Sequence, residues 1–190
     1  MPSYRDCIET ITGITDANEQ LEAARIRARD FVEVTISALG RTPAAGSTLA
    51  TALARHFVNP TAEQRAQIRT TYGQLLPALI VRNFICNRQN ICGEFQAGWL
   101  PDDDLIHVCP LFWKLDRNCQ AIVLIHEAAH DAGINVSGPH PFGRGTATYP
   151  AGNHPPPEGE TPATRMENPD AYGFFAAHVA RETDTGKSCR

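Results

Sequence analysis

Residues 121–133 read AIVLIHEAAHDAG, and this stretch decides the fold because it places an HExxH pattern on a helix. His126 and His130 are four residues apart, so they lie on one helical face, where both imidazoles can reach one metal ion. Glu127 stands beside them and can take a proton from a metal-bound water without being a ligand itself. The pattern therefore predicts a zinc hydrolase site.

The surroundings of the pattern favour this interpretation over a chance match of five letters. The run of Ala, Ile, Val and Leu before it demands burial, and a His-Glu-His cluster beside such a run is costly unless something pairs with it. Asp116 is a good N-cap and Gly133 a good C-terminal stop. The pattern thus falls in the last turns of one bounded helix.

Length and charge narrow the class of protein. With 190 residues and 42% hydrophobic content, the chain is long enough for one domain with its own core and short for two, so we expect a single domain over 1–190. The net charge is -4 and no Lys/Arg-rich run is present, which argues against nucleic acid or an anionic membrane as a partner. We expect a monomer that acts on a protein or peptide.

Cysteine use points to an oxidising compartment. The six cysteines form no CxxC pair, so we favour disulfides over a structural zinc; six buried free thiols in a cytosolic protein are the alternative. The first residues, MPSYRD, lack the features of a signal peptide. We therefore expect a secreted or exported protein whose signal was removed or which uses another export route. The cysteines are Cys7, Cys86, Cys92, Cys109, Cys119 and Cys189.

The N-terminal half, 1–82, has the periodicity of helices. Helices are predicted over about 16–39, 44–57 and 61–81, with breaks at Gly40 and at Asn59-Pro60 and a capping start at Thr61. In the first of them the apolar positions at helical spacing are Leu21, Ala24, Ala28, Phe31, Val34 and Ala38.

The second half, 83–190, combines several kinds of element. Short apolar runs between 83 and 113 predict strands and a hairpin. After the HExxH helix comes a predicted loop over 134–165, which holds seven of the fourteen prolines, and then a last helix over about 168–181. The expected fold class is α+β, mostly helical with a small sheet.

Three stretches in this half carry a family resemblance. They are IHVCPLFW at 106–113, LIHEAAH at 124–130 and NPDAYGFFA at 168–176. In this order they resemble the aspzincin metallopeptidases, the group of deuterolysin and the lysine-specific metalloendopeptidases. The resemblance implies a zincin-like fold, one bound Zn²⁺ and peptide hydrolysis.

The resemblance also implies two disulfides, which correspond here to Cys7–Cys86 and Cys92–Cys109. A third pair, Cys119–Cys189, is our own hypothesis and is not implied by the family.

The third zinc ligand is where this chain departs from the family. Thr148 stands where the family has its ligating aspartate, and Val136 stands where a metzincin would have its third histidine. We predict His140, ten residues past His130 and flanked by prolines, with Asp170 and His154 as alternatives.

Two further residues are given roles by the resemblance. Asp170 matches the first of the acids with which lysine-specific members bind the substrate lysine, but Gly173 replaces the second, so Asp170 is instead a candidate to hydrogen-bond a ligating histidine. Tyr149 is the nearest match to the family's oxyanion-stabilising tyrosine, with Tyr172 as the alternative.

The function hypothesis is a zinc-dependent metalloendopeptidase in which Glu127 activates the attacking water. Two alternatives remain: a non-catalytic zinc-binding module, which the replacement at Thr148 keeps open, and a bacterial toxin or effector protease with one specific protein target.

Overall fold

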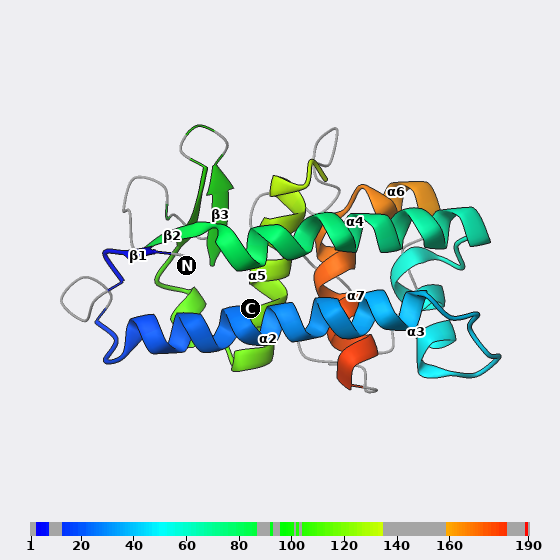
Figure 1. The fold of residues 1–190 in the computed structure, drawn as a ribbon, viewed down its shortest axis with the longest axis horizontal. Coiled ribbons are helices and arrows are strands. Elements are labelled where there is room, and N and C mark those ends of the chain that lie inside the picture. The colour runs from blue at the N-terminus through cyan, green and yellow to red at the C-terminus, as the bar shows by residue number, and fades with distance from the viewer. Residues whose placement is uncertain are drawn as a thin grey trace.

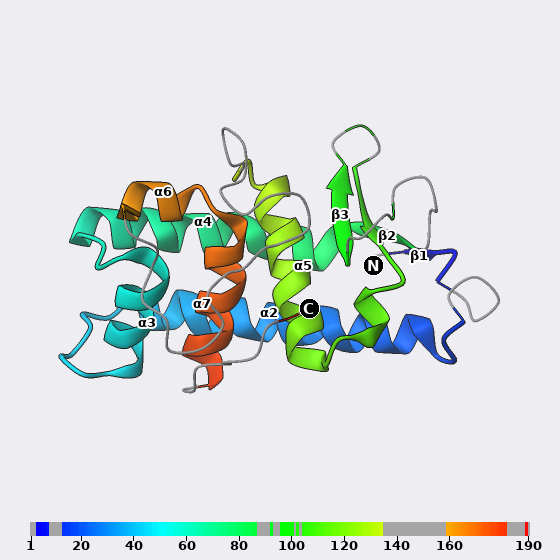
Figure 2. The same ribbon diagram turned by 180° about the vertical axis from the view of Figure 1, so that it is seen from behind.

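Two crossed pairs of helices form the body of the molecule. The computed structural model describes residues 3–7, 13–86, 92, 96–100, 102, 104–134, 159–181 and 189. The long helices α2 (Ala17–Leu39) and α4 (Ala62–Val81) run side by side, and α5 (Arg117–Asp131) and α7 (Pro169–Arg181) cross behind them (Figures 1 and 2). The helices α3 (Thr48–Phe57) and α6 (Pro162–Met166) lie at one end, and a sheet lies at the other.

The sheet is small and mixed. Its order is β1-β2-β4-β3, formed by β1 (Tyr4–Arg5), β2 (Asn83–Cys86), β4 (Leu105–Val108) and β3 (Ala97–Leu100). The first three strands are parallel, and β3 pairs with β4 as the predicted hairpin. A short 3-10 turn, η1 (Phe112–Lys114), leads into α5. The predicted α+β class, mostly helical with a small sheet, is confirmed.

The capping residues explain most helix bounds. The Oδ1 atom of Asp116 accepts hydrogen bonds from the backbone N–H groups of Asn118 and Cys119, both at 2.9 Å, so α5 begins where the sequence predicted. Thr61 and Gln64 form the expected capping box of α4. Gly133 has a φ of 83°, and it ends the HExxH helix as predicted.

Two expected element bounds were wrong, one strand was missed, and one apolar position of α2 is exposed. The second helix begins at Thr48 rather than at 44, because Ser47 caps it by accepting a hydrogen bond from the Ala50 N–H. The segment predicted as loop to 165 ends in α6, capped by Thr161, and the two-residue β1 is too short for a pattern to reveal. Val34, expected on the buried face of α2, is 46% exposed.

All three disulfide pairs expected from the sequence are present. Cys7–Cys86 joins the segment after β1 to β2. Cys92–Cys109 joins the segment between β2 and β3 to the residue that follows β4. Cys119–Cys189 ties the first turn of α5 to the C-terminal end of the chain. These bonds fit folding in an oxidising compartment.

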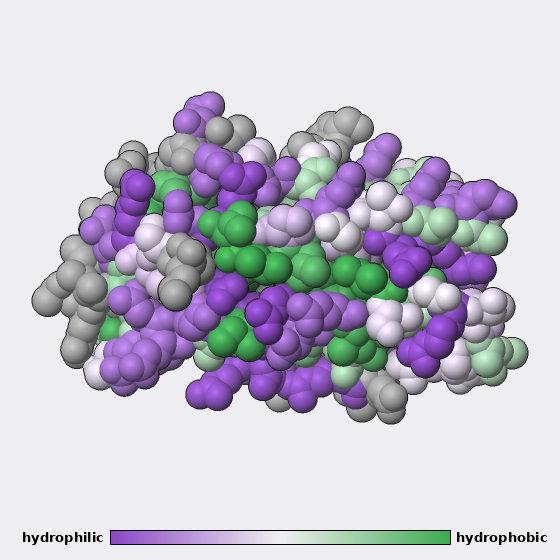
Figure 3. All heavy atoms as spheres, in the orientation of Figure 1, coloured by the Kyte–Doolittle hydropathy of each residue, from purple (hydrophilic) through white to green (hydrophobic). Residues whose placement is uncertain are grey.

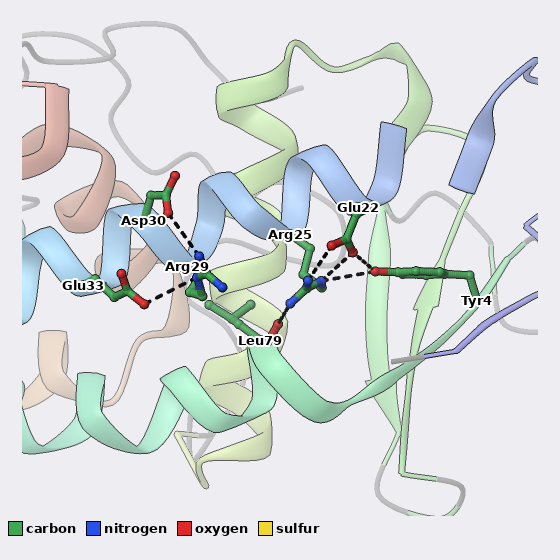
Figure 4. Close-up of polar contacts among 7 residues, drawn as sticks. All are labelled: Tyr4, Glu22, Arg25, Arg29, Asp30, Glu33 and Leu79. Carbon is green, nitrogen blue, oxygen red and sulfur yellow. Dashed lines mark hydrogen bonds and ion pairs between the residues drawn. The ribbon is translucent and has the colours of Figure 1, made fainter. Parts of the chain in front are cut away.

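A polar cluster fixes the N-terminal strand to the helices (Figure 4). Arg25 donates to both carboxylate oxygens of Glu22 at 2.6 and 2.7 Å, to the Tyr4 hydroxyl at 3.1 Å and to the Leu79 carbonyl at 2.7 Å. The Tyr4 hydroxyl also donates to Glu22. Burial and this hydrogen bond raise the pKa of Tyr4 to about 12. Together, Arg25 and Tyr4 join β1, α2 and α4, which secures the β1 side of the sheet.

Apolar side chains gather on the outer face of the long helices, along the junction of α2 with α4 (Figure 3). Among the described residues, four large hydrophobic side chains are exposed, all on α2 or α4: Ile26, Val34, Ile80 and Val81. Within the described residues, no helix combines the length and apolar character needed to cross a bilayer.

A buried histidine pair lies between α3 and α7, away from the HExxH pattern. His56 Nε2 is 3.0 Å from His178 Nδ1, and both side chains are buried. Burial lowers the pKa of His56 well below its ordinary value, and His178, Arg55 and Arg165 act in the same direction. Burial and Arg55 also lower the pKa of His178. Both imidazoles are therefore neutral in the folded protein near neutral pH.

Acid is expected to destabilise the fold through this pair. In the unfolded chain each histidine takes up a proton near pH 6.5, whereas in the folded chain it does so only at lower pH. The free energy of unfolding should therefore fall below pH 6.5 by up to about 1.4 kcal/mol per pH unit for each histidine. Urea denaturation between pH 7 and 5 measures this slope. The His56→Leu/His178→Leu double variant should show a flatter slope, and an unchanged slope would contradict the assignment.

Candidate metal and catalytic site

The two histidines of the HExxH pattern, His126 and His130, point toward one place as two ligands of a single metal ion do; they are called the metal pair below. Their Nε2 atoms lie 3.1 Å apart near the end of α5. Two nitrogens bound to one tetrahedral zinc at 2.0–2.1 Å would lie about 3.3 Å apart. The spacing of His126 and His130 therefore fits joint ligation of a single zinc ion with almost no movement.

Asp170 holds the opposite side of the His126 ring. Its Oδ1 atom lies 2.6 Å from His126 Nδ1 and accepts that N–H, which leaves Nε2 to face His130. Burial opposes charge on His126, but the charge and hydrogen bond of Asp170, with a contribution from Glu127, raise the pKa of His126 to about 9. Such a carboxylate fixes the tautomer and direction of a ligating imidazole.

This geometry separates two of the roles considered for Asp170. A zinc ion held by both Nε2 atoms would be on the opposite side of the His126 ring from Asp170. The same carboxylate cannot bond Nδ1 and coordinate that ion, so the geometry argues against Asp170 as the third ligand.

The start of α7 positions Asp170. Asn168 Oδ1 accepts the Asp170 backbone N–H at 2.9 Å, and Pro169 occupies the first helical position, where a missing N–H costs nothing. The sequence Asn168-Pro169-Asp170 therefore both starts the helix and directs a carboxylate at the HExxH helix.

Glu127 lies beside the histidine pair and against the sheet. Glu127 is 5% exposed, and its Oε2 atom accepts the backbone N–H of Trp99 in β3 at 2.7 Å. Its negative charge acts on His126, as the pKa of that ring shows. A carboxylate in this place can serve as a proton acceptor next to a metal held by the two histidines.

Several predicted site residues lie outside the described part of the chain. They are His140, Tyr149 and His154, together with the replaced position Thr148. Among the described residues, no group of three His, Cys, Asp or Glu side chains is close enough to hold a metal. Tyr172, the alternative to Tyr149, is buried and its hydroxyl donates to the Met166 carbonyl at 3.0 Å, which commits it to packing.

One ion pair beside the site was not predicted. Arg82, just after α4, binds Asp131 through Nε at 3.0 Å and Nη2 at 2.8 Å, and it also contacts Asp104. Asp131 directly follows His130, so this pair fixes the end of the HExxH helix to α4 and to the β3–β4 turn. The sequence shows that Asp131 directly follows HExxH, but it does not identify Arg82 as the partner of this acid.

Comparison with known proteins bears on the fold. No protein-family model matches the sequence, and no curated protein matches it either. A solved structure of a zinc peptidase from Grifola frondosa superposes on this chain with a TM-score of 0.62, covering 86% of this chain and 96% of that one, at 18% sequence identity. At this identity the likeness concerns the fold alone. The predicted resemblance to the aspzincins is thereby confirmed at that level: the chain has the fold of a zinc peptidase.

Proposed function

We propose that the chain is a zinc-dependent metalloendopeptidase of the aspzincin family. The observation that carries this proposal is the placement of the two Nε2 atoms, 3.1 Å apart, with Asp170 on the outer nitrogen of His126. Glu127 on the same helix supplies the carboxylate that hydrolysis requires. Glu127 is a buried carboxylate beside the two histidines that is not needed as a ligand, and hydrolysis requires such a proton acceptor, so Glu127 favours catalysis over the non-catalytic module.

The chain's own groups divide the work of peptide hydrolysis. Zinc, when bound, supplies a Lewis acid that polarises the scissile carbonyl and lowers the pKa of the attacking water. Glu127 accepts the proton of that water and later passes it to the leaving amine. Asp170 keeps His126 in the tautomer whose Nε2 lone pair faces the metal position. In this proposal Tyr149 donates to the oxyanion that develops on the carbonyl.

His140 completes the ligand set in this proposal. Two histidines leave the site one protein ligand short of the three that a catalytic zinc normally takes. Asp170 is engaged with His126 Nδ1, so the choice lies between His140 and His154, and His140 is nearer in sequence to the end of α5.

The biological setting follows from the same features. We propose a single-domain, monomeric peptidase that is exported, because three disulfides are expected only where thiols are oxidised. Its substrate is a protein or peptide. Neither nucleic acid nor a membrane is part of the proposal.

One set of measurements tests the function and the ligand together. The native chain should bind one zinc per molecule and cut an unfolded protein substrate; a chelator should stop cleavage and added zinc should restore it. His140→Ala should lose zinc and activity, whereas the matched His154→Ala should keep both. A native protein that binds zinc and cuts nothing would favour the non-catalytic module. Stoichiometric zinc and activity in His140→Ala would place the third ligand elsewhere.

A further inference from the structure

The backbone N–H of Trp99 lies on the outward edge of strand β3 and is not used by the sheet. Cys109 N–H donates to the Gln96 carbonyl at 2.9 Å, and Trp99 is paired with Ile106. Because hydrogen-bonded and non-hydrogen-bonded pairs alternate in an antiparallel ladder, the Trp99 N–H points away from β4. Since β3 is the last strand of the sheet, this N–H faces α5 rather than another strand.

The acceptor of this donor is the carboxylate next to the metal pair. The Trp99 N–H lies 2.7 Å from Glu127 Oε2, and Glu127 is almost completely buried. A hydrogen bond from a backbone amide to an ionised carboxylate is about twice as strong as one between neutral groups. The contact joins the sheet to the HExxH helix at the residue that the mechanism uses.

We propose that the backbone N–H of Trp99 is a positioning group for Glu127, holding Oε2 on the sheet edge so that Oε1 is the oxygen presented to the attacking water. The inference rests on the proposed peptidase function. A glutamate side chain on a helix has three rotatable bonds, and ordering it costs conformational entropy. The amide keeps the carboxylate ordered before substrate arrives, which a general base within hydrogen-bond reach requires.

The chain allows a clean removal of this donor. Trp99→Pro deletes the N–H but no bond to β4, because that N–H points away from β4 toward Glu127, and within sheets proline occurs on edge strands such as β3. Gly98 before it lies in a strand, the conformation that a following proline favours. Trp99→Ala is the matched control, since it loses the same indole and keeps the N–H.

The proposal predicts a loss of kcat rather than of substrate binding. Relative to Trp99→Ala, Trp99→Pro should lower kcat by about 10- to 100-fold, the size of effect expected from a misplaced catalytic group, with KM nearly unchanged and zinc content equal. Equal kcat in the two variants would overturn the positioning role while leaving the peptidase function standing. A rise in KM alone would assign the amide to substrate binding and would also overturn the proposal. If neither the native chain nor Trp99→Ala cuts substrate, the peptidase function itself fails, and the positioning role with it.

Hydrogen exchange gives a second measurement that does not depend on activity or on folding of the proline variant. In the native protein the Trp99 amide should exchange slowly, although no neighbouring strand accepts it. In Glu127→Ala it should exchange at least about tenfold faster, as expected when a local hydrogen bond is lost, while the Gly98 amide, which faces β4, should not change. Equal exchange of the Trp99 amide with and without the Glu127 carboxylate would overturn the proposal.

Discussion

Replacing Glu127 with glutamine is expected to lower the rate of peptide hydrolysis by about 10²- to 10⁴-fold while bound zinc stays at the native level. Glutamine has nearly the same shape and its side-chain oxygen can still accept the Trp99 N–H, so the contact between α5 and β3 should survive. It cannot take up the proton of the attacking water. Because Glu127 is not a ligand in this mechanism, the metal pair of His126 and His130 is left intact.

The control for Glu127→Gln is a glutamate whose replacement should change neither the rate of hydrolysis nor the zinc content. Glu19 lies exposed in the first turn of α2, and Glu19→Gln removes the same charge far from the metal pair. Initial rates on an unfolded protein substrate and the zinc content per chain should be measured for both variants. Full activity with full zinc in Glu127→Gln would rule out the proposed mechanism, whereas loss of zinc in that variant would make Glu127 a ligand.

The HExxH helix could be predicted from the sequence because its signals are local. Its apolar run, its cap at Asp116 and its stop at Gly133 all lie within the helix or beside it, and the structure places its start and end accordingly. The disulfides were predictable because the first two follow from the family resemblance, and the third pair was the remaining hypothesis.

The contacts that orient the site were harder to predict, since they join distant parts of the chain. A backbone N–H is present at every residue except proline, so no pattern could identify the one at Trp99 as the partner of Glu127. The bidentate pair of Arg82 with Asp131 likewise depends on how α4 and α5 meet. Only Asp170 had a local signal, because the Asn-Pro-Asp start of α7 also matches a family motif.

Packing between α5 and α7 explains why position 173 is a glycine in this chain, which the sequence alone does not explain. The family's lysine-specific members have an acid at this position. Here a Cβ atom would lie 2.8 Å from the Ile122 backbone oxygen and 3.0 Å from Ile122 Cγ2. The helices α5 and α7 approach so closely at this point that any side chain at 173 would need them to move apart.

Gly173→Ala is therefore expected to destabilise the protein by about 1–3 kcal/mol, the usual cost of overpacking. On helix propensity alone the change would stabilise α7 by about 1 kcal/mol, but a contact with backbone cannot be relieved by turning a side chain. The end of α5 is also fixed by Asp131, so the displacement should fall on α7. Asp170 lies one turn before Gly173, and its hydrogen bond to His126 should lengthen. Zinc affinity should then drop by about tenfold or more, as it does when the partner of a ligating histidine is disturbed.

Gly73→Ala provides the matched control because it makes the same change in a helix with open space around it. Gly73 is exposed in α4, and a Cβ there would meet no atom within 4 Å. This variant should gain about 0.5–1 kcal/mol from helix propensity and keep the native zinc affinity. Urea denaturation of the zinc-free proteins and competition with a zinc chelator measure the two effects. If both glycine variants were stabilised equally, the close approach of α5 and α7 would not limit position 173, and the missing acid would need a different physical cause.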